Sequence, residues 1–321
     1  MTFTKDFAYS TTYGRTYIGD SLDLIEDLEN NSVSLAFTSP PFALLRKKDY
    51  GNMDQDEYVE WLAGFARKIM PKLKEDGSLV VDLGGAYERG YPIRSLYNYK
   101  VLIYFCEVLG YNLAQEFFWN NPAKLPSPIE WVNKRKLRVK DSVNTVWWFS
   151  KSKFPKADSR KVLNPYSDRM KKLIKDPASF YTPAKRPSGH DIGASFGIDN
   201  GGSIPSNLLS YSNSESNTKY MQHCKKLAIK AHPARFPKKL PEFFVNFLTD
   251  ENDLVVDFFA GSNTTGEVCE ELKRRWYSFE ISADYVAASA FRFIEEQDEA
   301  QQIYNDIISG KSFNFYPSFQ P

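Results

Sequence analysis

Residues 253–268 read DLVVDFFAGSNTTGEV, an apolar run that ends at Asp257 and continues into a glycine-containing turn and a helix start. In α/β sheets, nucleotide-like ligands bind where the carboxyl end of a strand meets the N-terminus of a helix. Glu280 lies 19 residues after Gly261, at the end of the next expected strand, where a carboxylate can accept both hydroxyls of a ribose. The pattern GxGxxG is absent, which disfavours a site for the pyrophosphate of NAD. The stretch therefore predicts a strand, a turn and a helix that bind a nucleoside-like ligand, with an ordinary βα turn as the alternative.

Strands and helices are expected to alternate on both sides of this unit. The expected strands are 17–18, 33–37, 79–81, 113–119, 145–149, 254–258 and 276–279. The expected helices are 21–28, 55–69, 96–109, 239–248, one from 264, and 283–296. This alternation predicts an α/β fold with a doubly wound, mainly parallel sheet. The pattern is lost between about residues 151 and 232, a stretch rich in Ser, Asn, Pro, Gly and Lys with interleaved aromatic residues. Loops of this length are usually functional or disordered, and the aromatic residues argue against simple disorder.

Composition excludes several classes of protein. The chain has 321 residues, of which 42% are hydrophobic, but no apolar run approaches the roughly 20 residues of a membrane span. The first 14 residues lack the basic start and apolar centre of a signal peptide. The three cysteines and three histidines show neither CxxC nor HExxH spacing. We therefore expect reduced thiols, a cytoplasmic protein, and neither a metal nor a membrane partner.

Charge is unevenly distributed along the chain. Residues 124–186 hold 17 Lys and Arg against 5 Asp and Glu, whereas the whole chain has 41 basic and 40 acidic residues. Clustered positive charge is typical of a polyanion partner, most often nucleic acid. A solubilising surface is the alternative interpretation.

Residues 38–42 read TSPPF and directly follow the apolar run 33–37. Proline cannot donate to a sheet ladder, so Pro40 and Pro41 must lie beyond the end of the strand. Each proline ring fixes its own φ and restricts the preceding residue. The result is a stiff turn that presents a serine, two backbone carbonyls and an aromatic ring, although a rigid loop without a chemical role would look the same.

Together, TSPPF at 38–42 and DFFAGSNTTG at 257–266 resemble the amino-methylating DNA methyltransferases that use S-adenosylmethionine. Those enzymes carry a D/N/S-P-P-Y/F motif and an F-x-G-x-G-type cofactor motif. Here the catalytic motif comes first and the polar insert lies between the two, as in the β group of the family. Further similar segments are YIGDSLDLI, LVVDLGGAY, NPAKLPSPIEWVNKRK, NTVWWFSK, SGHDI, NGGSIPSNLL, AHPARFPKKLPEFF and ISADYVAASAFRF. Phe258 and Asn263 stand where Pro and Gly are common in the family, and Asn tolerates the positive φ of such a turn.

The resemblance implies a circularly permuted Rossmann-like methyltransferase sheet, mostly parallel with one antiparallel strand. Residues 1–150 would form the catalytic half, 151–232 the target-recognition region and 233–321 the cofactor-binding half. Ser in the first position of the motif and Phe in the last resemble the N4-cytosine enzymes rather than the N6-adenine ones. The implied partners are double-stranded DNA and, as in restriction–modification systems, a cognate restriction endonuclease that acts on the same site without direct binding.

The resemblance also gives the TSPPF turn a chemical role. The amino nitrogen of cytosine is a poor nucleophile because its lone pair is delocalised into the ring, and two hydrogen-bond acceptors would localise that pair. Ser39 Oγ and the Pro40 carbonyl would be these acceptors, and Phe42 would stack on a base flipped out of the duplex. Asp82 would receive the proton through Ser39. The implied catalytic residues are Ser39, Pro40, Pro41, Phe42 and Asp82.

The remaining implied site residues bind the cofactor or the DNA. Glu280 would bind the ribose of S-adenosylmethionine, Asp20 would face the adenine, and the turn at 259–265 would lie near the methionine half. The implied cofactor-binding residues are Asp20, Thr38, Phe236, Lys238, Asp257, Phe259, Gly261, Ser262, Asn263, Thr264, Thr265 and Glu280. The implied DNA-binding residues are Lys124, Lys134, Arg135, Lys136, Arg138, Lys140, His190 and Asn207. Asp20 could equally be a helix N-cap.

Other activities are weighed against these residues. Carbon methylation of cytosine needs a thiolate, usually from a cysteine that follows a proline, and Cys106, Cys224 and Cys269 follow Phe, His and Val. An N6-adenine methyltransferase, an inactive DNA-binding protein of the same fold and a nucleotide-dependent oxidoreductase stay as alternatives.

Overall fold

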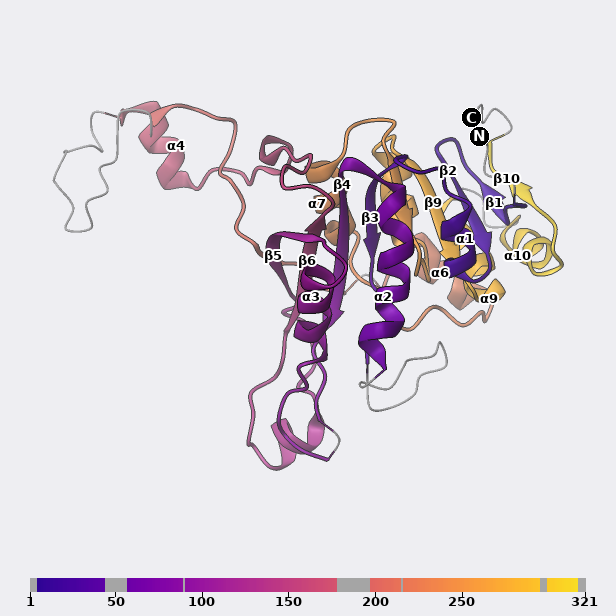
Figure 1. Cartoon of the computed structure of the whole chain (residues 1–321), viewed down its shortest axis with the longest axis horizontal. Coiled ribbons are helices and arrows are strands. Elements are labelled where there is room, and N and C mark those ends of the chain that lie inside the picture. Colours follow the sequence, from indigo (N-terminus) through magenta and orange to yellow (C-terminus); the bar gives the residue numbers. More distant parts are fainter. Residues whose placement is uncertain are drawn as a thin grey trace. The chain divides into compact units, whose positions relative to one another are not determined.

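The computed structural model describes residues 5–43, 57–88, 90–177, 197–214, 216–294 and 299–316. Within these ranges the strands form a single ten-stranded sheet in the order β10-β1-β2-β9-β8-β3-β4-β6-β5-β7 (Figure 1). The strands are β1 (Tyr9–Ser10), β2 (Gly14–Ile18), β3 (Val33–Thr38), β4 (Leu73–Gly84), β5 (Asn112–Asn120), β6 (Val143–Ser150), β7 (Leu208–Ser210), β8 (Leu254–Asp257), β9 (Arg275–Glu280) and β10 (Phe313–Asn314).

Strands from both ends of the chain build the centre of the sheet. β2, β9, β8, β3 and β4 are successive parallel neighbours, so β8 and β9 from the C-terminal part lie between β2 and β3. β6 runs antiparallel to both β4 and β5, and β7 pairs parallel with β5. At the other edge, β10 pairs parallel with β1, and β1 is antiparallel to β2. The expected fold is confirmed as a mostly parallel α/β sheet assembled in permuted order. β6 is the expected antiparallel strand, and the short strands β1 and β10 also run opposite to β2.

The helices of the larger part of the chain lie on both faces of this sheet, and α4 belongs to a separate compact unit (Figure 1). The helices are α1 (Ser21–Glu26), α2 (Tyr58–Ile69), α3 (Tyr97–Glu107), α4 (Asp168–Lys175), α6 (Lys219–Lys226), α7 (Lys239–Leu248), α8 (Thr264–Glu271), α9 (Ala283–Ser289) and α10 (Ala300–Ile308). Short turns of other helix types are η1 (Met70–Lys72), η2 (Glu130–Lys134), η3 (Ser159–Val162) and η5 (Ala290–Arg292). Figure 1 shows α1, α2 and α3 side by side in front of the sheet.

Alternate residues of β3 show how the two faces are filled. Phe37 packs on Phe244 of α7 with 5.7 Å between ring centroids. Its neighbour Ala36 belongs to the apolar cluster that includes Leu62 and Phe65 of α2. Successive side chains of a strand point to opposite faces, so a strand with helices on both sides is apolar throughout. This explains the continuous buried run of β3.

The chain divides into two compact units. The larger consists of Met1–Lys156 and Asn207–Pro321, and the smaller of Ala157–Ser206, which contains η3 and α4. β7 and α6, inside the stretch expected to be irregular, belong to the larger unit. Across the described ranges, no helix is both long and apolar enough to span a membrane.

Candidate active site

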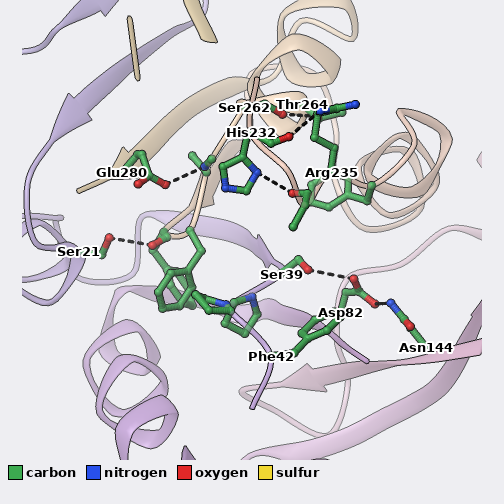
Figure 2. Close-up of a pocket in the computed structure, with 18 of the residues that line it drawn as sticks. Ser21, Ser39, Phe42, Asp82, Asn144, His232, Arg235, Ser262, Thr264 and Glu280 are labelled. Carbon is green, nitrogen blue, oxygen red and sulfur yellow. Dashed lines mark hydrogen bonds between the residues drawn. The ribbon is translucent and has the colours of Figure 1, made fainter. Parts of the chain in front are cut away.

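A cavity of about 600 Å³ lies at the carboxyl ends of the central strands. Ser39 follows β3, Asp82 lies near the end of β4, and Glu280 ends β9, and all three line this cavity. Its volume falls in the range of about 300–1,000 Å³ that is usual for ligand sites. Figure 2 shows the Ser39 and Glu280 side chains as separate groups around the same cavity.

A hydrogen-bonded chain of three side chains forms one part of the cavity wall. Ser39 Oγ donates to Asp82 Oδ2 over 3.0 Å, and Asn144 Nδ2 donates to Asp82 Oδ1 over 3.2 Å (Figure 2). Asp82 is 1% exposed, and burial raises its pKa to about 6, although the two hydrogen bonds and the Lys124 charge oppose the shift. A carboxylate with this pKa can accept a proton near neutral pH.

The aromatic ring of the TSPPF turn lies directly against the end of β4. A Cβ added at Gly84 would lie 2.3 Å from Phe42 Cε2, so only glycine allows this approach. The Tyr97 hydroxyl donates a hydrogen bond to the Gly84 carbonyl. Pro40, Pro41 and Phe42 all line the cavity. The turn therefore presents the ring and Ser39 to the same space.

Glu280 forms a second polar end of the cavity. Its Oε2 accepts from Gly261 N–H over 2.9 Å and its Oε1 from Ser282 N–H over 3.0 Å. Burial raises the pKa of Glu280, and these backbone donors oppose the shift. Asp20 lies on the cavity wall as the N-cap of α1 and accepts from Leu22 N–H over 2.8 Å. The structure thus gives Asp20 the cap position, and its carboxylate still borders the cavity.

Aromatic rings close the cavity between its polar groups. Phe259 packs on Phe65 and Trp61 of α2, with centroids 4.7 and 5.5 Å away. Phe236 meets Phe37 edge to face at 5.5 Å. Phe236, Phe259, Trp61 and Phe65 all line the cavity, so an apolar ring system would find flat partners there.

Five of the expected cofactor-binding residues do not line the cavity: Thr38, Lys238, Asp257, Asn263 and Thr265. The Asp257 carboxylate accepts from Thr38 Oγ1 (3.0 Å), Thr265 Oγ1 (2.6 Å) and Phe259 N–H (3.1 Å), and burial raises its pKa to about 6. Asn263 is fully buried with φ +54° and caps α8 by accepting from Gly266 N–H over 3.0 Å. These side chains hold the turn that carries Gly261, Ser262 and Thr264, which do line the cavity.

Several cavity residues had no role in the sequence interpretation. His232 lies over Gly261, where a Cβ would be 3.1 Å from its ring and φ is +51°. Its Nδ1 donates to the Ala234 carbonyl over 2.7 Å, and Figure 2 shows it between Glu280 and Arg235. Further lining residues of this kind are Trp119, Asn121, Asn144 and Asn213. Of these residues, Asn144 alone is a polar residue inside an apolar strand, in the run NTVWWF of β6, whereas His232, Asn121 and Asn213 lie outside the strands and carry no such sequence signal.

The expected DNA-binding residues divide into different settings. Lys124 lines the cavity, and burial lowers its pKa while Asp141 and Asp82 raise it. Lys134 and Arg135 are exposed and pair with Glu130 at 3.4 and 2.9 Å. Lys136 follows with φ +55°. These three lie on the connection between β5 and β6.

The other expected DNA contacts have structural partners or lie outside the described residues. Arg138 stacks on Tyr87 and lies 3.7 Å from Asp141, while Lys140 donates to the Pro122 and Lys124 carbonyls over 3.3 and 3.2 Å. The Asn207 amide donates to the Glu116 carbonyl over 2.8 Å, beside β5. His190 lies outside the described residues.

Over the part of the chain that the structure describes, no group of three or more His, Cys, Asp or Glu residues could hold a metal ion. The cavity instead combines the Asp82 and Glu280 carboxylates at separate ends, a rigid serine turn and aromatic walls. This arrangement suits a nucleoside-like ligand beside a planar base.

The permuted sheet and the TSPPF site define an amino-methylating DNA methylase, and the chain belongs to the DNA methylase family, whose model matches residues 33–291. It is similar to the type II methyltransferase M.PvuII of Proteus hauseri, with 61% identity over 317 residues, 98% of this chain and 94% of that protein. A solved structure described as the cytosine-N4-specific PvuII DNA methyltransferase shares 52% identity at a TM-score of 0.81, over 98% of this chain and 99% of the other. The M1.HpyAVI–SAM complex matches at 19% identity and a TM-score of 0.50, over 87% of this chain and 98% of the other, which shows the fold alone.

Proposed function

We propose that this chain transfers a methyl group from S-adenosylmethionine to the N4 amino group of a flipped cytosine in double-stranded DNA. The observation that carries the proposal is the Ser39–Asp82–Asn144 chain, which shares one cavity with Glu280. The relative described as cytosine-N4-specific matches nearly its whole length to this chain, which supports the same target atom.

The cavity fits S-adenosylmethionine in volume and in its donor set. The Glu280 carboxylate would accept the ribose hydroxyls, Asp20 would face the adenine, and Phe236 and Phe259 would offer apolar surface. Gly261, Ser262 and Thr264 would border the methionine half. The cofactor supplies a methyl group activated on a sulfonium. Thr38, Asp257, Asn263, Thr265 and Lys238 would act indirectly, because they hold the turn and its surroundings.

Ser39 and Asp82 would handle the proton of the target amine. Because Ser39 Oγ donates to Asp82, its lone pairs point away from that bond and can accept an amino N–H. The Pro40 carbonyl would accept the second N–H, so that the nitrogen lone pair is localised. As the nitrogen loses a proton, Ser39 would take it and pass its own to Asp82 Oδ2. Phe42 would stack on the flipped cytosine.

Carbon methylation of cytosine has no nucleophile at this site. None of Cys106, Cys224 and Cys269 lines the cavity, and burial raises the pKa of each thiol. A thiolate is the reactive form, so these cysteines are poorly suited to attack a ring carbon.

We further propose that residues 151–232 contain most of the target-recognition region, with 1–150 and 233–321 as the catalytic and cofactor-binding halves. The role would be that of a modification enzyme, paired with a cognate restriction endonuclease that acts on the same site without direct binding. A cytoplasmic location stays a prediction from the cysteine pattern.

Transfer of tritiated methyl groups from S-adenosylmethionine to duplex DNA tests the proposal. Label should enter unmodified DNA, and DNA saturated by the enzyme should accept no more. An inactive DNA-binding protein of the same fold would bind the duplex without transferring label.

A further inference from the structure

The connection between β5 and β6, residues 121–142, carries aliphatic side chains that point into solvent. Leu125 is 79% exposed, Ile129 61%, Leu137 62% and Val139 84%. Burying such side chains is favourable, so an exposed group of them marks an interaction surface rather than a solubilising one.

This loop begins at the carboxyl end of β5, on the same side of the sheet as the cavity. β5 and β4 are both antiparallel to β6, so β5 and β4 run in the same direction. Their carboxyl ends therefore lie on the same side of the sheet. Asn121 and Lys124 of the loop line the cavity beside Asp82. Leu125 is the next residue, so it lies at the mouth of the proposed base pocket.

The loop is fixed in place by its own polar contacts. The Lys140 ammonium donates to the carbonyls of Pro122 and Lys124, so the segment of Val139 runs alongside the segment of Leu125. Arg138 stacks on Tyr87 with its guanidinium carbon 4.7 Å from the ring centroid. Leu125 and Val139 are therefore held on adjacent segments near the cavity.

Charge identifies the occupant of this surface. The 121–142 loop holds six Lys and Arg against two Asp and Glu. Lys134 and Arg135 are 69% and 59% accessible, and both pair with Glu130. Lysines and arginines around a small apolar group suit a duplex, whose phosphates surround stacked apolar base faces. A partner protein with an apolar patch would not need this excess of basic residues on the loop.

We propose that Leu125 and Val139 enter the duplex beside the target cytosine and fill the stacking space that the flipped base leaves. The inference rests on the proposed base-flipping function and assigns to these two residues a positioning role. Flipping breaks stacking and pairing, and an inserted apolar side chain offsets part of that loss. The contribution should therefore matter only where the base is still paired.

The test compares two duplexes that contain the cytosine identified by product mapping. One has guanine opposite that cytosine, and the other has an abasic site, which lowers the cost of flipping. The variant is Leu125→Ala with Val139→Ala, and the control is Val108→Ala. Val108 is 60% exposed and lies between α3 and β5, at the amino end of that strand and not at its carboxyl end.

The double variant should lose roughly tenfold to a hundredfold in kcat/KM on the paired duplex and regain most of it on the abasic duplex. Its salt dependence of binding should match the wild type, because no charge is removed. Val108→Ala should behave as wild type on both. An equal loss on both duplexes, or no loss on either, would overturn the proposal.

A change in oligomeric state on sedimentation of the double variant without DNA would also overturn it, in favour of a surface between two copies. The methylation function is judged separately by the wild type. If the wild type methylates neither duplex, the proposed function fails, whereas wild-type activity with an unchanged double variant removes only the insertion role.

Discussion

Ser39 Oγ and Asp82 Oδ2 lie 3.0 Å apart across the ends of two neighbouring parallel strands, although 43 residues separate them in the chain. β3 ends at Thr38 and pairs with β4 through Thr38 and Val81, so the next residue on each strand meets the other. The proline turn then keeps Ser39 in place. This contact links the rigid turn to a buried carboxylate, and the expected effects below follow from it and its surroundings.

Replacing Ser39 with Ala should abolish most turnover while cofactor and DNA binding persist. The loss of one preorganised polar group at a reacting nitrogen is expected to cost roughly two to three orders of magnitude in kcat. Single-turnover methyl transfer measures it. Ser32→Ala is a matched control, because Ser32 Oγ bonds the Glu29 carbonyl at the other end of β3. Near-normal turnover of Ser39→Ala would remove the proposed role.

The rate should depend on the ionisation of Asp82. Burial raises its pKa to about 6, so kcat is expected to fall as the pH drops through about 6 and Asp82 becomes protonated. Asn144→Ala removes a donor that lowers this pKa, which should move the acid limb of the pH–rate profile to higher pH. Asn112→Ala, on β5, should leave the profile unchanged. A limb that stays fixed or moves to lower pH in Asn144→Ala contradicts the assignment.

Glu280→Gln should weaken binding of S-adenosylmethionine. Charge-assisted hydrogen bonds contribute about 1.5–3 kcal/mol, so the dissociation constant should rise roughly tenfold to a hundredfold. Titration calorimetry measures it, and Glu251→Gln, an exposed carboxylate in the loop before β8, is the control. DNA affinity without cofactor should not change. Equal cofactor affinity in Glu280→Gln and wild type would show that the ribose contact is wrong.

The exposed cations of the 121–142 loop should contribute to DNA binding without base preference. Lys134→Ala with Lys136→Ala should weaken binding to all duplexes alike. The slope of log K against log salt should also become shallower by about 0.9 for each phosphate that no longer binds a lysine. Arg67→Ala with Lys273→Ala is the matched control, because Arg67 lies near the end of α2 and Lys273 just before β9, both outside the 121–142 loop. A slope equal to that of the wild type, with the circular dichroism spectrum intact, would favour a solubilising surface.

The sequence was sufficient to predict the central strands and the two motifs, because both follow from local patterns, but it did not predict the short strands β1, β7 and β10. Apolar runs predict buried strands, and a polar residue directly after such a run lies at a strand end, as Ser39 and Glu280 do. The expected helix 96–109 and the strand 145–149 agree with α3 and β6 to within a few residues. Strand β4 is longer than its apolar part, because Leu73 pairs with Val33 before a polar, irregular stretch.

Contacts that depend on tertiary pairing could not be predicted in this way. Asn144 reaches Asp82 because antiparallel pairing places it opposite Gly84, two residues further along β4. His232 reaches Gly261 only through the path of a loop. Conversely, Asp257 looks like a ligand in the sequence, but its carboxylate is used by Thr38, Thr265 and a backbone N–H inside the fold.

The most direct measurement is the identity of the modified base. DNA is exposed to the enzyme with S-adenosylmethionine whose methyl group carries deuterium, digested to nucleosides, and separated by chromatography with mass detection. The label should appear in N4-methyldeoxycytidine. Label in 5-methyldeoxycytidine or in N6-methyldeoxyadenosine would contradict the assignment of the Ser39–Asp82 site to the amino group of cytosine.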